Sequence, residues 1–525
     1  MEIVCKRHIE LPHTSKLFAD LLYHFDRVAG LYAHDPHEPQ SYWQAARQID
    51  FPAERRRALV DVLEKQNGAS ESVRRLAREG TFVVATGQQT GLFSGPAYSI
   101  YKALTAVRLA EQLTAQGLEA VPVFWLATED HDFAEVSACW SFDVNHTPVL
   151  LRLPAEALSD RPVGEIALRE VPIKKLEESL AGFPYAEEVL RLARAAYCPG
   201  RTLGEAFQQL LSALLKPYDL LFFDPMQPEA RRLAAPILKQ AVSAAPLLTQ
   251  ALLERNRELQ KAGYHAQVHM DEHTSLFFLL EDGRRLNLRR KNGEYFHKDR
   301  RWTSQQLMDR AETLSPNATL RPVVQDYIFP TVAYVGGPAE LAYLAQSEVI
   351  YRQLLGRMPV ATSRHAFTLI DPRSRKLMQR YGLGLESFFE GEEPLRERIA
   401  TRLTPPEVAH ALESTQQSVR SALENLRRSV ASFDQTLGEA LDRSARKIQY
   451  QLTKLQRKVA RESLRRSQRA MEESAYLFQG IYPHKHLQER YYTILPFLAR
   501  HGLDLVERLY EHLHPNCVDH HVLYL

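Results

Sequence analysis

The chain has 525 residues, of which 45% are hydrophobic and 25% are charged. This composition is typical of globular proteins and excludes wholesale disorder and fibrous repeats. Because a single hydrophobic core stops growing near about 250 to 300 residues, the length predicts two or three packed units. Lys and Arg total 66 against 64 Asp and Glu, so the net charge of +2 provides no overall field that would gather nucleic acid or an anionic membrane.

The cysteines indicate a reducing compartment. Cys5, Cys139, Cys198 and Cys517 lie far apart and form no Cys-x-x-Cys pair, a pattern that fits reduced thiols better than a disulfide framework or a zinc knuckle. The first residues, MEIVCKRHIE, contain no apolar signal region, and no segment approaches the roughly 20 apolar residues that span a bilayer. We therefore expect a cytoplasmic protein with no membrane partner.

Residues 1–80 predict an N-terminal helical extension that packs on the core, because apolar residues such as Leu17 and Leu21 recur at helical spacing. The pattern then changes. Short β-branched runs at 81–85 and 121–127 flank a helical segment and form a βαβ unit, which predicts parallel strands in a doubly wound α/β sheet. Further strands are expected at 220–224, 331–335 and 367–371.

Insertions are expected to interrupt the parallel-sheet core. The core segments are residues 81–136, 206–261 and 321–395, and the insertions are residues 137–205 and 262–320. The second insertion contains an expected hairpin, SLFFLLEDGRRLNLRR, that turns at Asp282 and Gly283. Residues 479–525 are expected to form a helical segment that returns to the core.

Residues 405–478 predict an antiparallel coiled-coil arm. Apolar residues in 408–426 and again in 441–459 are spaced alternately four and three apart, which is the seam of a left-handed coiled coil. The seam weakens at 433–438, where we expect a turn between two helices. A basic run at 457–469 resembles a nucleic-acid or lipid patch, but such a run more often forms a solvated helix face, and we prefer that interpretation.

A glycine-rich loop, ATGQQTGLFSGPAYSIYK, lies between the first predicted strand and its helix, where open parallel sheets bind their ligands. Its glycines allow tight turns, and the following helix would offer N–H groups to phosphate or carboxylate. The loop is neither a Walker loop nor a G-x-G-x-x-G fingerprint, and a purely structural turn is the alternative. Because polar side chains crowd the loop, we favour ligand binding. The candidate residues are Gly87, Gln88, Gln89, Gly91, Ser94, Gly95 and Tyr98.

Four ionisable residues, Glu129, Asp130, His131 and Asp132, directly follow the strand at 121–127. They are therefore expected at the carboxyl edge of the sheet, where they could orient an amine, act as a general base, or hold a Mg²⁺ that carries nucleotide phosphates. A solvated loop with an Asp N-cap is the alternative, but a cap explains one ionisable residue rather than four. Because we expect the cluster to be exposed, substitutions in it should cost no more than about 0.5 kcal/mol of stability.

Two later segments extend the candidate site. AYVGGPAELAYLAQ repeats the order strand, glycines, helix, and its Gly336, Gly337 and Glu340 form a second candidate anion site. Arg364 and His365 precede the strand at 367–371. This pair could bind a carboxylate, although a surface or capping role is an equal alternative.

The tail contains residues at metal-like spacing. They are His514, Cys517, His520 and His521. Because terminal segments are usually poorly ordered, we prefer a disordered end with chance histidines, and we predict no metal centre.

The segments GQQTGLFSGPAYSIYK, FWLATEDHDFAEV, VGGPAELAY and LQER together resemble the bacillithiol biosynthesis cysteine-adding enzymes, the BshC family. Their order and the predicted arm extend the resemblance over nearly the whole chain. It implies a Rossmann-like core similar to class I aminoacyl-tRNA synthetases, with inserted connecting-peptide segments and a coiled coil that forms a homodimer. It also implies a ligase that joins L-cysteine to the glucosamine amine of glucosaminyl-malate in the last step of bacillithiol biosynthesis.

The resemblance adds Lys102, Gln488 and Arg490 to the binding candidates and implies that residues 129–132 are catalytic. Family members usually have Asn-Gly where this chain has His484 and Lys485 ahead of LQER, which alters the expected shape of that loop. The chain also contains neither His-Ile-Gly-His nor Lys-Met-Ser-Lys-Ser. These are the adenylate-forming elements of class I synthetases, so the chemistry of synthetases cannot simply be transferred.

Amide synthesis in water requires an activated acyl group. We therefore expect ATP or a related nucleotide, with Mg²⁺ as a candidate companion, to activate cysteine as an acyl-adenylate or an acyl-phosphate. In this interpretation the loops 87–96 and 336–338 bind anionic groups, while Asp130, His131 and Asp132 position or deprotonate the sugar amine. Two alternatives stay open: a nucleotidyltransferase-like enzyme that acts on a small acid, and a non-enzymatic coiled-coil scaffold or nucleic-acid-binding protein.

Overall fold

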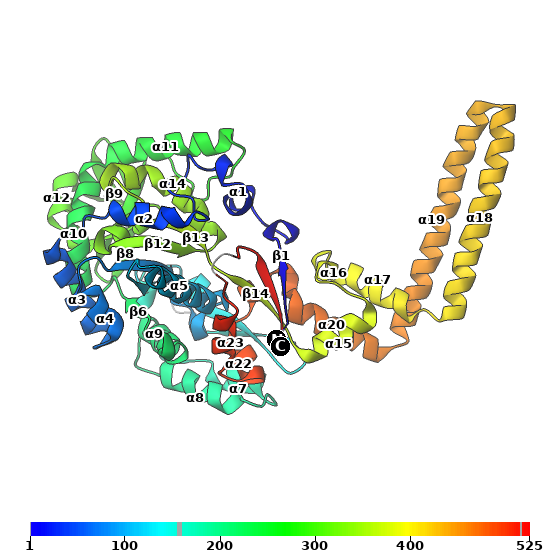
Figure 1. The fold of residues 1–525 in the computed structure, drawn as a ribbon, viewed down its shortest axis with the longest axis horizontal. Helices are drawn as coiled ribbons and strands as arrows, with labels where there is room; N and C mark the ends of the chain where they lie inside the picture. The colour runs from blue at the N-terminus through cyan, green and yellow to red at the C-terminus, as the bar shows by residue number, and fades with distance from the viewer. Residues whose placement is uncertain (1, 155–159, 515–516) are drawn as a thin grey trace.

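The computed structural model describes residues 2–154, 160–514 and 517–525. At its centre is a sheet of five parallel strands in the order β13-β12-β2-β3-β6 (Figure 1). The strands are β2 (Phe82–Gln88), β3 (Ala120–Leu126), β6 (Leu221–Phe223), β12 (Thr331–Gly336) and β13 (Val360–Ser363). The predicted parallel α/β core is confirmed. The edge strand β13 was not predicted, because its sequence, VATS, offers only a short apolar run.

Both faces of this sheet are covered, which explains why its strands read as continuous apolar runs. Every residue of β3 is buried. Val123 and Trp125 belong to one hydrophobic cluster, and Phe124 and Leu126 belong to another. This alternation follows from the two-residue period of a strand, and helix α5 (Tyr98–Ala115) packs on β2 and β3.

Helices surround the central sheet and link it to the rest of the chain (Figure 1). Those before and within the core are α1 (Lys16–Tyr23), α2 (Pro39–Arg47), α3 (Ala53–Asn67), α4 (Glu71–Leu76), α6 (Phe133–Val136), α10 (Pro228–Ser243), α11 (Ala245–Lys261), α13 (Arg321–Ile328) and α14 (Pro338–Leu354). The region predicted as the first insertion contains the hairpin β4 (Ala138–Phe142) and β5 (Pro148–Arg152), with α7 (Ile173–Leu180), α8 (Ala186–Ala196) and α9 (Leu203–Leu214).

The predicted hairpin in the second insertion is confirmed, and it belongs to a five-stranded antiparallel sheet. β7 (Thr274–Glu281) turns into β8 (Arg284–Lys291) through Asp282 and Gly283, both with positive φ. Two such residues suit the twist of a two-residue hairpin turn. The other elements are β9 (Glu294–His297), β10 (Arg300–Thr303), β11 (Leu314–Pro316) and α12 (Ser304–Asp309).

A third sheet joins segments from the two ends of the chain. Its order is β1 (Glu2–Lys6), β15 (His520–Tyr524) and β14 (Ala366–Ile370), and the marked chain ends lie side by side in Figure 1. Three predictions are corrected here. The strand at 367–371 is not part of the parallel core, residues 1–80 are not all helical, and residues 520–524 of the expected disordered end form strand β15, in which His520 and His521 are buried.

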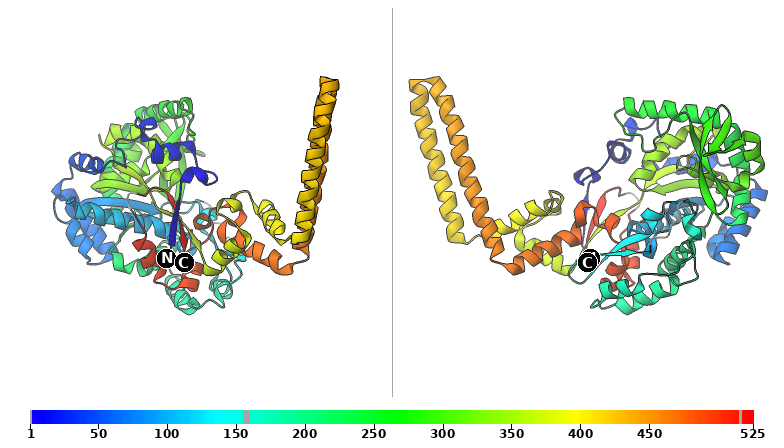
Figure 2. Two further views of the ribbon diagram at one scale, coloured as in Figure 1. Left: turned by 45° about the vertical axis from the view of Figure 1, so that its right-hand side comes forward. Right: turned by 180° about the vertical axis from the view of Figure 1, so that it is seen from behind.

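The predicted arm is present as two long antiparallel helices, α18 (Pro406–Phe433) and α19 (Gln435–Arg465). They project away from the rest of the molecule in all three views (Figures 1 and 2). The turn falls in the predicted region, where the Asp434 side chain accepts hydrogen bonds from the backbone N–H groups of Thr436 and Leu437. The expected arm extended to residue 478, but α20 (Gln468–Ile481) packs instead on α15 and α17.

The remaining C-terminal helices connect the arm to the core. They are α15 (Pro372–Tyr381), α16 (Glu386–Phe389), α17 (Glu392–Leu403), α21 (Gln488–Tyr491), α22 (Leu495–His501) and α23 (Leu505–Glu511). Within the described ranges, none of the helices is both long enough and apolar enough to cross a membrane.

Candidate functional site

The carboxyl ends of the parallel strands bring the predicted motifs to one edge of the sheet. The chain runs from β2 outward to β3 and β6, and then returns to β12 on the other side of β2. In open α/β sheets, ligands bind at such a reversal of strand order, outside the carboxyl ends of the strands. The loops 87–96 and 336–338 flank this switch point.

Glycine is required in loop 87–96 for close approach and for positive φ. A Cβ at Gly87 would lie 2.7 Å from the carbonyl oxygen of Trp125, and one at Gly91 would lie 3.0 Å from the Cα of Gly95. Gly95 and Ser94 have φ values of 63° and 72°, so the chain turns sharply before α5. Ser94 is buried, and its hydroxyl hydrogen-bonds within the protein. These residues therefore shape the loop.

Several backbone N–H groups that were expected to bind an anion are already used within the protein. Gly91 and Gly95 donate to carbonyls of the same loop at 3.0 and 2.9 Å, and Ala97 donates to a carbonyl of the C-terminal segment at 2.8 Å. After β12, the N–H of Gly337 donates to the Glu340 carboxylate at 2.8 Å. In this conformation an anionic ligand would therefore depend mainly on side chains.

Lys102 is a buried cation at the switch point. Its side chain is 1% exposed, and its Nζ donates to the Gly87 carbonyl, to Gln88 Oε1 at 3.2 Å and to Glu340 Oε2 at 2.6 Å. Burial raises the pKa of the Glu340 carboxyl, but the Lys102 charge and the hydrogen bonds outweigh burial and lower it. The contacts of Lys102 therefore tie the loop after β2 to the loop after β12.

Arg364 binds a carboxylate, as one interpretation predicted, but the carboxylate is the chain's own Glu489. The two guanidinium nitrogens donate to it at 2.9 and 2.6 Å, and the side chains of the pair are 4% and 2% exposed. The Arg364 guanidinium also lies 4.9 Å from the ring centroid of Tyr98, whose hydroxyl accepts a hydrogen bond from Gln88. Arg490 is exposed and lies 5.7 Å from the same centroid. Arg490 can therefore reach a ligand.

His365 and Gln488, two further candidates, make structural contacts. His365 is 6% exposed, its Nε2 lies 2.9 Å from the carbonyl oxygen of His514, and burial lowers its pKa to about 4. Gln488 donates to the carbonyls of Leu369 and Gly480 at 3.0 and 2.6 Å and accepts from the Leu369 N–H at 2.8 Å. Gln488 thus binds the LQER segment to β14.

The loop before LQER contains two residues with positive φ, His484 at 47° and Lys485 at 63°. The left-handed region costs a residue with a Cβ about 1 to 2 kcal/mol. We expect Lys485→Gly to raise the free energy of unfolding by about 1 kcal/mol, because glycine avoids this strain and Lys485 is exposed. Thermal melting measures the change. Lys458→Gly, at an exposed position inside α19, should instead lower stability by about 1 kcal/mol, and a similar loss in both variants would contradict the argument.

A second polar cluster lies at the end of β3. Gln89 Nε2 donates to Asp130 at 2.7 Å and to Glu135 at 2.8 Å. Arg285 Nη1 donates to Asp130 Oδ1 at 3.3 Å and lies 3.0 Å from His131 Nδ1. Burial alone raises the pKa of Asp130, but the hydrogen bonds from Gln89 and from the backbone N–H of His131, together with the Arg285 charge, outweigh it and lower the pKa. Asp130 is therefore an ionised carboxylate and a weak base.

Arg285 also determines which hydrogen bonds the His131 ring can make. A guanidinium can only donate hydrogen bonds, so the contact with Arg285 engages the Nδ1 lone pair, and the proton of the neutral ring is on Nε2. The His131 side chain is 32% exposed. In this arrangement His131 offers a ligand an N–H donor, and it could act as a base only after Arg285 releases Nδ1.

The other two residues of the cluster have different surroundings. Glu129 is 4% exposed and accepts a hydrogen bond from Ser315 at 3.0 Å. Burial raises its pKa, while the charge of Arg285 acts in the opposite direction. Asp132 is exposed and caps α6 by accepting from the Glu135 N–H at 3.1 Å. The expectation of a wholly exposed cluster is therefore wrong, and the N-cap alternative is confirmed for Asp132.

Arg285 and Glu489 are the candidates that the sequence interpretation missed. Arg285 lies on β8 in the insertion hairpin, 155 residues from Asp130, and its side chain is 7% exposed. Nothing local in RRLNLRRK distinguishes it from the neighbouring arginines. Glu489 carried a usable signal, since it lies within LQER, the motif from which only Gln488 and Arg490 were selected.

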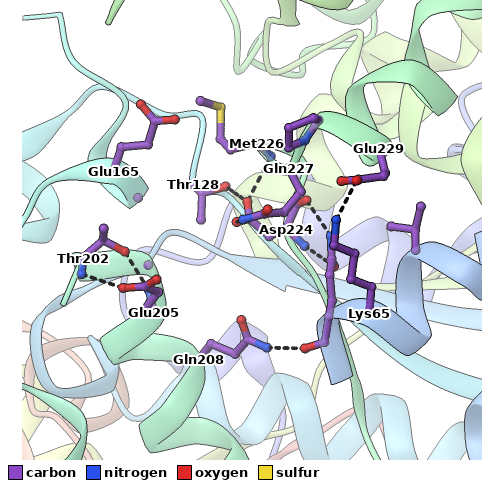
Figure 3. A pocket seen from close by; sticks show the side chains of 15 residues that line it. Lys65, Thr128, Glu165, Thr202, Glu205, Gln208, Asp224, Met226, Gln227 and Glu229 are labelled. Atoms are coloured by element: carbon purple, nitrogen blue, oxygen red, sulfur yellow. Dashed lines mark hydrogen bonds and ion pairs between the residues drawn. The ribbon is translucent and has the colours of Figure 1, made fainter. Parts of the chain in front are cut away.

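A cavity of about 470 Å³ lies next to the second cluster, at the carboxyl ends of β3 and β6 (Figure 3). Thr128 and Asp224 meet there through a hydrogen bond, and Lys65 pairs with Glu229 at 2.6 Å. The acidic residues of its lining are Glu165, Glu205, Asp224 and Glu229. With four carboxylates and one lysine, this cavity suits a cationic or neutral polar group better than a phosphate. No predicted site residue lines it.

Comparison with known proteins covers the whole chain. Residues 4–365 match the family model "Bacillithiol biosynthesis BshC, N-terminal Rossmann-like domain", and residues 367–525 match the model of its C-terminal coiled-coil domain. The chain belongs to the BshC family. A relative from Solibacter usitatus is 54% identical over 523 residues that cover 100% of both chains. Relatives from Koribacter versatilis and Symbiobacterium thermophilum are 34% and 31% identical, with 98% and 92% of each chain covered.

Each of these three BshC relatives carries the name "Putative cysteine ligase BshC". The chain is accordingly a ligase of the bacillithiol biosynthesis family, with a Rossmann-like domain and a coiled-coil domain. This assignment favours an enzyme over the scaffold alternative. The similarity of the BshC core to class I aminoacyl-tRNA synthetases, and the roles of individual site residues, stay predictions.

Proposed function

We propose that this BshC chain forms the amide bond between the carboxyl group of L-cysteine and the glucosamine amine of glucosaminyl-malate, in the cytoplasm and as the last step of bacillithiol biosynthesis. One observation carries the proposal: in a chain of a ligase family, the polar side chains around Lys102 and those around Asp130 both lie at the switch point of the parallel sheet. This is the position where such sheets bind their ligands. The family resemblance supplies the identity of the substrates.

The switch point is the proposed site of nucleotide and cysteine activation. Gln88, Tyr98 and the exposed Arg490 lie together there, and the Lys102–Glu340 pair holds the two loops in place. A bound ATP or related nucleotide would transfer its adenylyl or phosphoryl group to the cysteine carboxylate, with release of pyrophosphate or ADP, and Mg²⁺ is a candidate companion. Because the loop N–H groups are largely engaged, Arg490 is the cation that we expect to meet an anionic group.

The second cluster is the proposed site of the sugar amine. The ionised Asp130 carboxylate can accept hydrogen bonds from an amine or ammonium group, and His131 can donate from Nε2 to a ligand oxygen. Gln89 follows Gln88 in the loop after β2 and donates a hydrogen bond to Asp130, so it links this loop to the second cluster. We propose that the cluster positions the amine, with deprotonation by His131 requiring movement of Arg285.

The decisive experiment incubates the purified chain with ATP, L-cysteine and glucosaminyl-malate and detects the amide by mass spectrometry. Release of AMP indicates an acyl-adenylate, and release of ADP indicates an acyl-phosphate. Reactions that omit one substrate are the controls. Nucleotide turnover that needs only one small acid would favour the nucleotidyltransferase alternative, and no amide from folded protein with all three compounds would overturn the proposal.

The arm is proposed to form a homodimer. No residue of α18, all of which is described, is buried, and Leu426, Leu437 and Leu455 are 49%, 47% and 48% exposed. A second copy could cover this apolar surface in a two-fold contact. We expect Leu452→Asp combined with Leu455→Asp to yield monomers in light scattering. Lys458→Asp, an exposed position on the same helix, serves as the control, and a double variant that stays dimeric would contradict the proposal.

A further inference from the structure

Three potential metal ligands meet where the two ends of the chain pair. Cys5 on β1 lies opposite His521 on β15 in the antiparallel register, and Cys517 precedes that strand. The two Sγ atoms are 3.8 Å apart, and His521 Nε2 lies 3.2 Å from Cys517 Sγ. One ligand atom from each residue falls within 4.8 Å of the others.

These distances resemble the edges of a tetrahedral zinc site. Zn–S bonds of about 2.3 Å and Zn–N bonds of about 2.0 to 2.1 Å, at tetrahedral angles, place two sulfurs about 3.8 Å apart and a sulfur about 3.5 Å from a nitrogen. The 3.8 Å between the Sγ atoms of Cys5 and Cys517 matches the sulfur–sulfur value. The 3.2 Å between His521 Nε2 and Cys517 Sγ is slightly shorter than the sulfur–nitrogen value. A disulfide would require about 2.05 Å.

The histidine is held in place before any ion binds. His521 is fully buried, and its ring packs 5.5 Å from the ring of His365 and 5.3 Å from that of Phe367. Both neighbours belong to the segment that leads into and begins β14. Fixed orientation of a ligand by its surroundings strengthens a metal site.

We propose that Cys5, Cys517 and His521 bind a thiophilic divalent cation of the Zn²⁺ class, with the fourth position taken by water or an external ligand. Thiolate and imidazole ligands favour such ions over Mg²⁺. The ion would cross-link β1 to the segment around β15, close to the Arg364–Glu489 pair. The site is independent of the amide-forming reaction proposed above.

The test uses the untagged full chain, reduced and treated with a chelator, and titrates it with Co²⁺. We expect one Co²⁺ per chain, with a thiolate-to-Co²⁺ band in the near ultraviolet and visible bands of tetrahedral intensity, and we expect Zn²⁺ to displace it. Cys5→Ser should bind about 100-fold more weakly or not at all, since even outer partners of a ligand are worth 10- to 100-fold. Cys5 is exposed, so this variant should fold.

Cys198→Ser is the matched control, because Cys198 is a partly exposed free thiol elsewhere in the chain. Cys198→Ser should bind Co²⁺ like the natural chain. Zn²⁺ should raise the melting temperatures of the natural chain and of Cys198→Ser, but not that of Cys5→Ser. Absence of the thiolate band in the natural chain, or equal binding by Cys5→Ser, would overturn the proposal. A Cys5–Cys517 disulfide that persists in reducing buffer would also overturn it.

Discussion

Replacing Asp130 with Asn, or His131 with Ala, should lower amide formation about 10²- to 10⁴-fold, the range commonly lost with a positioned acid, base or donor. Asp130→Asn keeps the shape of the side chain but removes the charge that faces Arg285 and the proposed amine. His131→Ala removes the Nε2 donor. Product formation with ATP, L-cysteine and glucosaminyl-malate measures both variants.

Folding must be measured alongside activity. Because Asp130 hydrogen-bonds to Gln89 and to the buried Arg285, Asp130→Asn should cost about 1 to 3 kcal/mol. This exceeds the 0.5 kcal/mol or less that an exposed loop would lose. Glu135→Gln is the control, since its amide oxygen can still accept from Gln89 and activity should stay near normal. Near-normal product from both folded site variants would place the chemistry elsewhere.

Glu489→Gln should lower the free energy of unfolding by about 3 to 5 kcal/mol. The substitution leaves the Arg364 guanidinium, 4% exposed, without its counter-charge, and an uncompensated buried charge is strongly destabilising. Urea denaturation followed by circular dichroism measures the loss. Amide formation should fall as well, because the pair joins LQER to the end of β13.

Two comparisons separate the cost of leaving Arg364 buried without its counter-charge from the general cost of losing an ion pair. Glu177→Gln breaks the exposed Arg194–Glu177 pair at 2.7 Å and should leave the denaturation midpoint unchanged. Arg364→Met combined with Glu489→Met removes both charges and should recover most of the stability. A loss in Glu489→Gln no larger than that in Glu177→Gln would show that the buried pair contributes little.

The parallel core and the arm could be predicted because their signals are local. β2, β3, β6 and β12 are short apolar runs, and the 4,3 spacing continues through both arm helices. The strand β14 has the same apolar appearance, so its sequence did not reveal that it joins a different sheet. Its neighbour β15 lies about 150 residues later, and the end of the chain was predicted to be disordered because terminal segments are usually poorly ordered.

The loops of the candidate site could be predicted from the sequence, but the contacts of their side chains could not. Strand ends and glycines indicated the switch point correctly. The partners that set the chemistry come from distant segments, as with Arg285 for Asp130 and His131, and with Glu489 for Arg364. A spacing rule within one motif cannot identify such partners. The same limitation hid the approach of Cys5 to Cys517, which are 512 residues apart.

The sheet formed by β1, β15 and β14 has a consequence for synthesis on the ribosome. At about 5 to 20 residues per second, residue 520 emerges roughly half a minute to two minutes after β1. During that interval β1 lacks its neighbour, as does β14 once it has been synthesised, and unpaired strand edges are prone to pair with other chains. The parallel core can form earlier, since its last strand ends at Ser363. A nascent chain of this ligase is therefore expected to depend most on chaperones between completion of β13 and arrival of β15.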